Sequence, residues 1–406
     1  MNILFVHQNF PGQYKHLAPE LVKRGHRVVA VGMAKREFSD IEYVRYSTKR
    51  GTSKELHPWV IDYEAKVIRA EACSEACLRL KEGGFTPDLI CVHPGWGEAL
   101  LLREVWPQAK QLHFVEFYYG SEGRDVGFDP EFPTPAFAGR CRLHIKNTNN
   151  LMNLVGMDAG ISPTKWQKST VPAEFQEKIS VIHDGVDTAA LTPDPNAVLR
   201  AKRDDGREIQ LSRKDSVVTF VNRNLEPSRG YHQFMRALPS IFAESPDTHI
   251  VIIGGDGVSY GAAPDEGTWK SRYLREVADD IDLSRVHFLG SVPYDTYKAA
   301  LRVSSAHVYL TYPFVLSWSM LESMSLGAPL IASSTPPVTE VVKDGENGWL
   351  VDFFDPKALA EKVIAVLDSD ATSVCERARQ TVVEKYDLQR VCLPKQIELV
   401  ERLIRS

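Results

Sequence analysis

Two arginines six residues apart are candidate anion-binding groups in the second half of the sequence. Arg223 and Arg229 follow the apolar run Val217–Val221, which is typical of a buried β-strand, and they span the end of that strand and the start of the next predicted helix. Guanidinium groups that converge on one point can each engage phosphate oxygens through two hydrogen bonds. The spacing fits a diphosphate site, and it equally fits two solvated arginines on the surface.

A helix start rich in serine follows a later strand and carries one carboxylate. A strand is predicted to end near Leu310, and a helix is predicted to begin near Ser317–Ser319 with Glu322 in its first turns. Hydroxyl groups in that position often cap a helix by accepting hydrogen bonds from its first backbone N–H groups. Glu322, at the carboxyl end of a strand, could instead accept hydrogen bonds from the diol of a ribose.

The first half of the sequence holds a second group of candidates, each directly after a predicted strand. Gly12 lies in HQNFPGQY, where a glycine lets the backbone approach an anion at the start of a helix. His93 lies in CVHPGWGE, and Glu116 and Tyr118 lie in HFVEFYYG. The alternative for Gly12 is an ordinary strand-to-helix turn, and the alternative for His93 is a structural histidine.

The elements that must position these residues are strands and helices in alternation, and the apolar pattern predicts such alternation in both halves of the chain. Strands are expected at residues 2–6, 27–31, 88–92, 111–117, 159–161 and 179–182, and again at 217–221, 249–253, 286–289, 307–310 and 329–332. This pattern predicts an α/β protein with two Rossmann-like, doubly wound parallel-sheet domains that face each other across a cleft. Ligands of such sheets bind at the carboxyl ends of the strands.

A polar stretch separates the two halves. Residues 193–215 are charged and poor in large apolar side chains, so we expect a connection between domains there. The predicted organisation is an N-terminal domain over residues 1–195, a linker over 196–215, a C-terminal domain over 216–385, and a C-terminal helix over 386–406 that packs back on the N-terminal domain.

The composition excludes several functional classes. Of the 406 residues, 48 are basic and 53 are acidic, so the basic excess typical of nucleic-acid-binding proteins is missing. No apolar run reaches the ~18–20 residues of a transmembrane helix, and MNILFVHQNF lacks the basic start of a signal peptide. We therefore expect a cytoplasmic protein without a transmembrane segment. Such a protein could contact a membrane only peripherally.

Several catalytic and metal-binding motifs are also missing. The sequence has no G-x4-G-K-[ST], H-E-x-x-H or G-x-S-x-G motif, and the glycines of IIGGDGVSYG have the wrong spacing for a dinucleotide fingerprint. Cys73 and Cys77 lie four residues apart on an apolar helix stripe, with no second Cys/His pair at zinc spacing. A packing role is therefore expected for both cysteines, a metal or redox role is the alternative, and we expect no metal site.

The ordered set of these segments resembles the retaining glycosyltransferases of family 4, which have the two-domain GT-B fold. The segments are FPGQYKHLAPELVKRGHRVVAV, DAGISPTKWQKS followed by KISVIHDGVDTAALTP, VNRNLEPSRG, HIVIIGGDG, VHFLGSV and TEVVKDGENGWLV. The resemblance covers nearly the whole chain. It implies a nucleotide-diphosphate sugar, most often UDP-linked, bound mainly to the C-terminal domain, with the acceptor on the N-terminal domain and no cofactor or metal.

The resemblance also assigns roles to individual residues. Arg223 and Arg229 match the phosphate-binding pair of the family, with Arg229 where a lysine is usual. Gly12 matches the glycine of the N-terminal domain at the diphosphate, and Glu322 matches the second glutamate of the E-x7-E motif, which holds the ribose. His93 is similar to a histidine that lies near the transferred sugar and acceptor in several members, so it is the catalytic candidate.

One position departs from the family pattern. The first glutamate of E-x7-E, which contacts hydroxyl groups of the donor sugar in the family, is replaced by Phe314. We therefore expect a donor sugar with a different hydroxyl pattern, or a contact from Ser317 or Ser319. Ser317 and Trp318 are expected beside the diphosphate, and Phe314 is expected on the side of the donor sugar.

The sequence is compatible with several acceptors and with more than one reaction. Glu116, Tyr118 and the loop 118–140 are expected on the acceptor or donor-sugar side, but the family transfers sugars to glycans, lipids, proteins and small molecules. Two alternative functions share the fold but do not transfer a sugar to an acceptor, namely a sugar-nucleotide epimerase and a catalytically silent binding subunit. A glycoside hydrolase would need a carboxylate pair such as Glu98 and Glu116.

Overall fold

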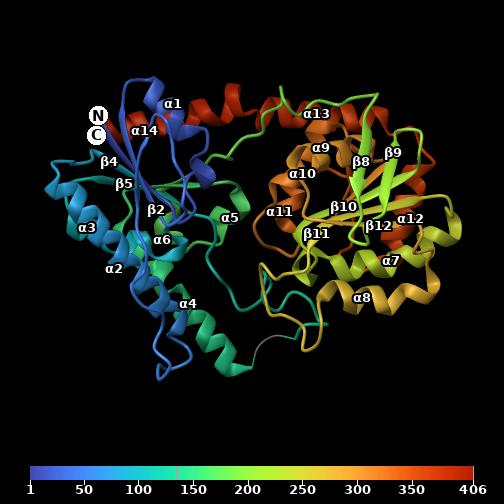
Figure 1. Cartoon of the computed structure of the whole chain (residues 1–406), viewed down its shortest axis with the longest axis horizontal. Helices are drawn as coiled ribbons and strands as arrows, with labels where there is room; N and C mark the ends of the chain where they lie inside the picture. The colour runs from blue at the N-terminus through green and yellow to red at the C-terminus, as the bar shows by residue number, and fades with distance from the viewer. Residues whose placement is uncertain (134–135, 406) are drawn as a thin grey trace. The chain divides into compact units, whose positions relative to one another are not determined.

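The computed structural model describes residues 1–133 and 136–405, so Thr134 and Pro135 of the predicted acceptor loop and Ser406 of the predicted C-terminal helix lie outside the described residues. The chain forms two compact units, each built around a parallel β-sheet with helices on both faces (Figure 1). Unit 1 contains residues 1–185 and 389–406, and unit 2 contains residues 186–388.

The sheet of unit 1 has seven parallel strands in the order β3-β2-β1-β4-β5-β6-β7. Residues Ile3–Val6 of the first strand are fully buried, because helices cover both faces of the sheet and every position must therefore be apolar. The strands are β1 (Asn2–Val6), β2 (Arg27–Gly32), β3 (Glu42–Arg45), β4 (Leu89–Val92), β5 (Lys110–Phe114), β6 (Ala159–Ser162) and β7 (Ile179–Val181).

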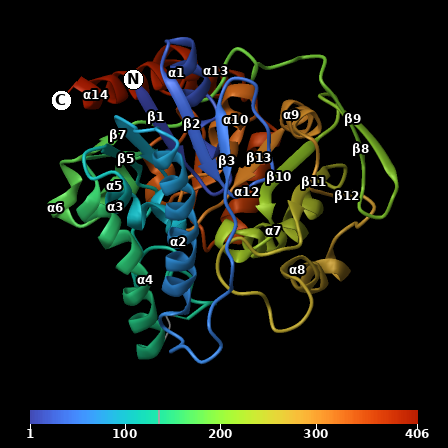
Figure 2. The ribbon, with the colours of Figure 1, turned by 60° about the vertical axis from the view of Figure 1, so that its left-hand side comes forward.

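The helices of unit 1 bury their apolar faces on this sheet. Helices α2 (Ile61–Glu82) and α3 (Leu102–Val105) share a core with strands β1, β2 and β4, and Cys73 and Cys77 of α2 are buried in that core. Helix α14 (Leu393–Arg405) packs against α1 (Leu17–Lys23), β4 and β5, so the C-terminal helix is part of unit 1. Helix α4 (Phe137–Gly156) lies beside α2 (Figure 2), and the short helices α5 (Lys165–Ser169) and α6 (Ala173–Gln176) follow it in the chain.

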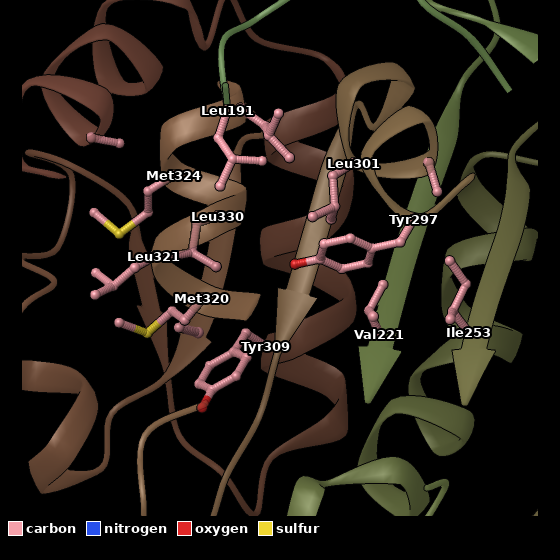
Figure 3. Close-up of a cluster of buried hydrophobic side chains, with 14 of the residues drawn as sticks. Leu191, Val221, Ile253, Tyr297, Leu301, Tyr309, Met320, Leu321, Met324 and Leu330 are labelled. Carbon is pink, nitrogen blue, oxygen red and sulfur yellow. The ribbon is translucent and has the colours of Figure 1, made fainter. Parts of the chain in front are cut away.

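Unit 2 repeats the plan with six parallel strands in the order β12-β11-β10-β13-β14-β15. One face carries α9 (Tyr294–Val303), α10 (Trp318–Leu326) and α13 (Thr372–Lys385), whose apolar residues pack on the strands (Figure 3). Helices α7 (Tyr231–Glu244), α8 (Trp269–Val277) and α12 (Pro356–Leu367) form the other layer, and α11 (Pro336–Thr339) is short. The strands are β10 (Val217–Asn224), β11 (His249–Gly255), β12 (Val286–Gly290), β13 (Ala306–Tyr309), β14 (Leu330–Ser333) and β15 (Trp349–Val351).

The stretch expected to be a linker is a β-hairpin instead. Strands β8 (Val198–Lys202) and β9 (Glu208–Ser212) pair in antiparallel fashion within unit 2. Leu199 and Leu211 face each other across the hairpin and are buried in the core of unit 2, and Ala201 and Ile209 pack against the same core. The expectation of a linker over residues 196–215 was wrong because these few apolar residues, although spaced among charged ones, anchor the hairpin on the core of unit 2.

Both sheets reverse their strand order at one point. The reversal lies between β1 and β4 in unit 1 and between β10 and β13 in unit 2. Ligands of doubly wound sheets bind at such a switch point, outside the carboxyl ends of the two strands. The loops that follow these four strands carry most of the candidate residues, so the topology brings them to the binding edge of each sheet. Within residues 1–133 and 136–405, no helix is both long enough and apolar enough to cross a membrane.

Candidate active site

A pocket of about 390 Å³ opens in unit 2 at the carboxyl ends of the strands. It brings together four residues predicted from the sequence, namely Arg223, Ser317, Trp318 and Glu322. Its wall also contains Asn222, whose side-chain nitrogen is buried and has no hydrogen-bond partner among the described residues. A buried donor without a partner is costly, so it indicates that a ligand or water completes this wall.

Arg223 supplies an open cation at the edge of this pocket. It is exposed near the end of β10, and no hydrogen bond or ion pair to another described residue holds its guanidinium group. An arginine in this state can offer all of its N–H donors to an incoming anion.

Arg229 is held much more tightly and does not line the pocket. It is buried, and its Nη1 donates to the Thr311 hydroxyl (2.8 Å) and to the Val315 carbonyl (3.0 Å). The guanidinium carbon lies 5.4 Å from the ring centre of Tyr260 and 5.9 Å from that of Phe314. We expected both arginines to converge on one site, but only Arg223 lines the pocket. Phe314 is a buried neighbour of Arg229.

The Glu322 carboxylate is held by two tyrosine hydroxyl groups. Tyr294 donates to Oε1 (2.9 Å) and Tyr297 donates to Oε2 (2.6 Å). Tyr297 is buried in the core shown in Figure 3, whereas Tyr294 is half exposed. Burial, with the adjacent carboxylate, raises the pKa of both phenols, so both remain donors at neutral pH. Each carboxylate oxygen keeps a second acceptor site, and Glu322 lines the pocket.

The first turn of α10 forms another side of the pocket. Ser317 is the N-cap residue, but its side chain caps no backbone N–H group and shares a hydrogen bond with the Ser319 hydroxyl instead (3.0 Å). The capping alternative for these serines is therefore not observed. The positive end of the helix dipole, together with the half-exposed Trp318, faces the pocket.

In unit 1, His93 lies at the end of β4 with its ring fixed on several sides. Its Nδ1 accepts a hydrogen bond from the Gly95 backbone N–H (3.2 Å), so the proton of the neutral ring is on Nε2. Nε2 lies 3.7 Å from a carboxylate oxygen of Glu116. The ring stacks on Trp96 (4.2 Å between centres) and on Phe114 (5.5 Å). His93 and Glu116 thus form a pair with a preset tautomer.

A second histidine lies beside His93 and explains the glycine at position 12. Burial, helped by the nearby His93, lowers the pKa of His7 to about 3, so this ring is neutral at physiological pH. Its Nε2 hydrogen-bonds the Gln13 side chain (2.7 Å). Gly12 has a φ of +48°, and a Cβ atom there would lie 2.3 Å from His7 Nε2. Only glycine fits this turn, which follows β1 at the switch point of unit 1.

Two further glutamate and tyrosine candidates have structural partners. The ring of Tyr118 packs against a small apolar cluster that includes Leu154 and Val171. Glu98 has no solvent exposure, bonds the Tyr46 hydroxyl (2.5 Å), and has a pKa raised by burial. A hydrolase that uses Glu98 and Glu116 as its carboxylate pair is therefore not supported by the structure.

The sequence analysis did not single out Asn222, Tyr294, Tyr297 or His7. One signal could have indicated the tyrosines, because they lie three residues apart at the start of a helix that follows a predicted strand of the second domain. The first turn of such a helix lies at the ligand-binding edge of a doubly wound sheet.

Solved structures that share this fold include GT-B glycosyltransferases. The chain aligns over 100% of its length with all of a sucrose-phosphate synthase from Thermosynechococcus elongatus, with a TM-score of 0.72 and 16% identity. It also aligns over 99% of both chains with Anabaena HepE in complex with UDP-glucose, with a TM-score of 0.68 and 15% identity. At these identities the likeness concerns the fold, and it defines the class as GT-B.

Two family models of glycosyltransferases match separate parts of the chain. Residues 24–191 match the glycosyl transferase family 4 group, and residues 202–383 match the glycosyl transferases group 1.

Among curated relatives, D-inositol 3-phosphate glycosyltransferase of Corynebacterium glutamicum is 28% identical over 200 residues, and phosphatidyl-myo-inositol mannosyltransferase of Mycolicibacterium smegmatis is 31% identical over 229 residues. The alignments cover 49% and 55% of this chain. The chain spans about half the length of these relatives, namely 45% and 51%.

Proposed function

We propose that the protein is a retaining, metal-independent glycosyltransferase that moves a sugar from a nucleotide-diphosphate sugar to a hydroxyl group of an acceptor. The observation that carries the proposal is the pocket of unit 2, which combines an open arginine, a helix N-terminus and a carboxylate aligned by two phenols. The domain families and the names of the relatives support it, and the UDP-glucose complex of a protein with the same fold makes a UDP-sugar the first candidate donor. Among the described residues no disulfide joins any of the six cysteines, which favours the cytoplasm as the location in this proposal.

In this proposal the candidate residues of unit 2 divide the binding of the donor among them. Glu322 accepts the two ribose hydroxyl groups. Arg223 and the first turn of α10 bind the diphosphate, and the buried Arg229 adds positive charge from outside the pocket lining. As the anomeric C–O bond breaks, negative charge develops on the diphosphate, and removing one preorganised donor from such a site costs roughly 3–4 kcal/mol of barrier. The arginines thus take the part that a divalent cation has in other transferases.

The transfer step that we propose needs no nucleophilic side chain. The acceptor oxygen bonds to the anomeric carbon on the face from which the diphosphate departs, and a phosphate oxygen takes the proton of the acceptor. The anomeric configuration is therefore retained. His93 presents its Nε2–H as a donor beside Glu116, and these two groups orient the sugar and the acceptor.

A specific observation keeps a second candidate function in view. Phe314 is buried against Arg229 at the position where a donor-binding glutamate is expected from the family pattern. A chain that has lost this contact could bind sugar nucleotides without turning them over.

A panel of UDP-, GDP- and ADP-sugars separates these functions. Release of the nucleoside diphosphate is measured with and without acceptors, beginning with inositol phosphates because of the names of the relatives, and the product configuration is determined by NMR. A transferase hydrolyses the donor slowly when no acceptor is present. With an acceptor it releases the nucleoside diphosphate faster and forms a product with the anomeric configuration of the donor. Epimerised donor without an acceptor would identify an epimerase, and binding without turnover would identify a silent subunit.

A further inference from the structure

Helix α4 buries an unusual run of asparagines. Four of the seven residues from 147 to 153 are asparagine, namely Asn147, Asn149, Asn150 and Asn153, and three of them are buried. Asparagine is a poor helix former, and a buried amide without partners destabilises a protein. The apolar residues Leu151, Met152 and Val155 of the same helix are exposed instead. The inward face of α4 is therefore built to make hydrogen bonds.

The partners of this face are the loops that carry His93 and Glu116. The Asn147 side chain accepts from the Tyr119 N–H (3.1 Å) and donates to the Tyr119 carbonyl (2.9 Å), as a neighbouring strand would. Asn150 donates to the Phe117 carbonyl (3.4 Å) and to Asn147 (3.2 Å). Asn149 donates to the carbonyl of Pro94 (3.1 Å), the residue next to His93.

A second set of side chains holds the same loop from the other direction. Gln167 of α5 donates to the Glu116 carbonyl (2.8 Å), and the Thr170 hydroxyl accepts from the Tyr118 N–H (3.1 Å). Strand β5 has already ended at Phe114, so these side chains take over the hydrogen bonds that a sheet would supply. The backbone over residues 116–119 is thus fixed without belonging to any element.

From these contacts we infer that Asn147, with Asn149 and Asn150, is a positioning device that sets the Glu116 carboxylate against His93 Nε2. The inference rests on the proposed function, because it assigns these two groups to the reaction. The pair is 3.7 Å apart, so a loop displacement of a few tenths of an ångström decides whether the two groups hydrogen-bond. A displaced His93–Glu116 pair would also orient the acceptor less well, so hydrolysis of the donor would compete more strongly with transfer.

The test compares Asn147→Ala with Asn153→Ala. Asn153 is a matched control, because it lies on the same helix, is buried to a similar extent (4% exposed against 7%), and bonds only Asn149 within the helix. Each variant is assayed for transfer and for hydrolysis of the donor sugar, and the ratio of the two rates does not depend on how much protein is folded.

We expect Asn147→Ala to lower the kcat of transfer by about 10- to 100-fold and to raise the ratio of hydrolysis to transfer by a similar factor, with little change in the donor KM. Asn153→Ala is expected to keep the wild-type ratio. Asn147→Asp retains the bond from the Tyr119 N–H, and its activity relative to wild type should recover as pH falls, because a protonated carboxyl group can donate to the Tyr119 carbonyl again. An equal ratio in the two alanine variants would overturn the inference.

A second readout does not depend on catalysis. Amide hydrogen exchange at Tyr119 should accelerate in Asn147→Ala and stay unchanged in Asn153→Ala. Equal exchange in the two variants would refute the role of Asn147 in holding the loop, even if the protein proves to have another activity. Failure of the proposed function is recognised separately, because the wild-type protein would then release no nucleoside diphosphate from any sugar nucleotide.

Discussion

Replacing Arg223 by alanine should weaken binding of the nucleotide and leave folding intact. The side chain is exposed and has no hydrogen bond or ion pair with another described residue, so the free energy of unfolding should change by less than about 0.5 kcal/mol. A hydrogen bond to a charged group contributes roughly 1.5–3 kcal/mol, which corresponds to an increase of about 10- to 150-fold in the Kd for UDP.

Arg229→Ala should behave differently, because this side chain also supports the fold. It loses two hydrogen bonds, to Thr311 and to the Val315 carbonyl, and leaves both acceptors in a buried site. We expect the free energy of unfolding to fall by about 2–4 kcal/mol, together with weaker binding of UDP.

Binding is measured by calorimetric titration with UDP at two salt concentrations, and stability by denaturant unfolding without ligand. Arg275→Ala is a control for loss of one positive charge, because Arg275 is exposed on α8 and outside the pocket lining. Wild-type affinity in Arg223→Ala would refute the assignment of this arginine to the diphosphate. A loss of stability in that variant would show that the Arg223 side chain makes hydrogen bonds or ion pairs within the folded protein, against our expectation.

Three other predictions test individual residues. Phe314→Glu should change the preference among sugar nucleotides by about tenfold, and an unchanged preference in the donor panel would end the idea that this position selects the sugar. His93→Ala should lower the kcat of transfer by about 100-fold with little effect on the Kd for UDP, whereas equal losses would indicate a structural role. Burial lowers the pKa of His7 and of His113 to about 3, against about 6.5 in the unfolded chain. Between these values the unfolded state binds more protons, so each histidine stabilises the fold fully above pH 6.5 and loses about 1.4 kcal/mol per unit as pH falls toward 3. His113→Gln should therefore reduce the steepness of this loss by about one proton in unfolding experiments from pH 5 to pH 7, and an unchanged slope would contradict the low pKa.

The strands were predictable from sequence wherever both faces of the strand are buried. The opening strand was expected at residues 2–6 and is observed there, because Ile3–Val6 are buried on both faces and all apolar. Strand β3 was missed, since EYVR at the edge of the sheet is half exposed and polar. The hairpin of β8 and β9 was missed because its charged face dominates its composition.

The candidate site was predictable where the residues lie at or soon after the carboxyl ends of neighbouring parallel strands. Arg223 and Glu322 meet in one pocket, and His93 meets Glu116, for this reason. Long-range partners were not predictable. Tyr294 lies 28 residues before Glu322, and no local pattern indicates that its hydroxyl reaches the carboxylate. The same holds for Asn147 and Tyr119, which are 28 residues apart.

A crystal structure with UDP would show directly where the nucleotide binds. We expect the diphosphate to bind Arg223 and the first turn of α10, and both ribose hydroxyl groups to bond the Glu322 carboxylate. A nucleotide bound elsewhere, with Arg223 directed into bulk solvent and Glu322 bonded only to its tyrosines, would contradict this expectation.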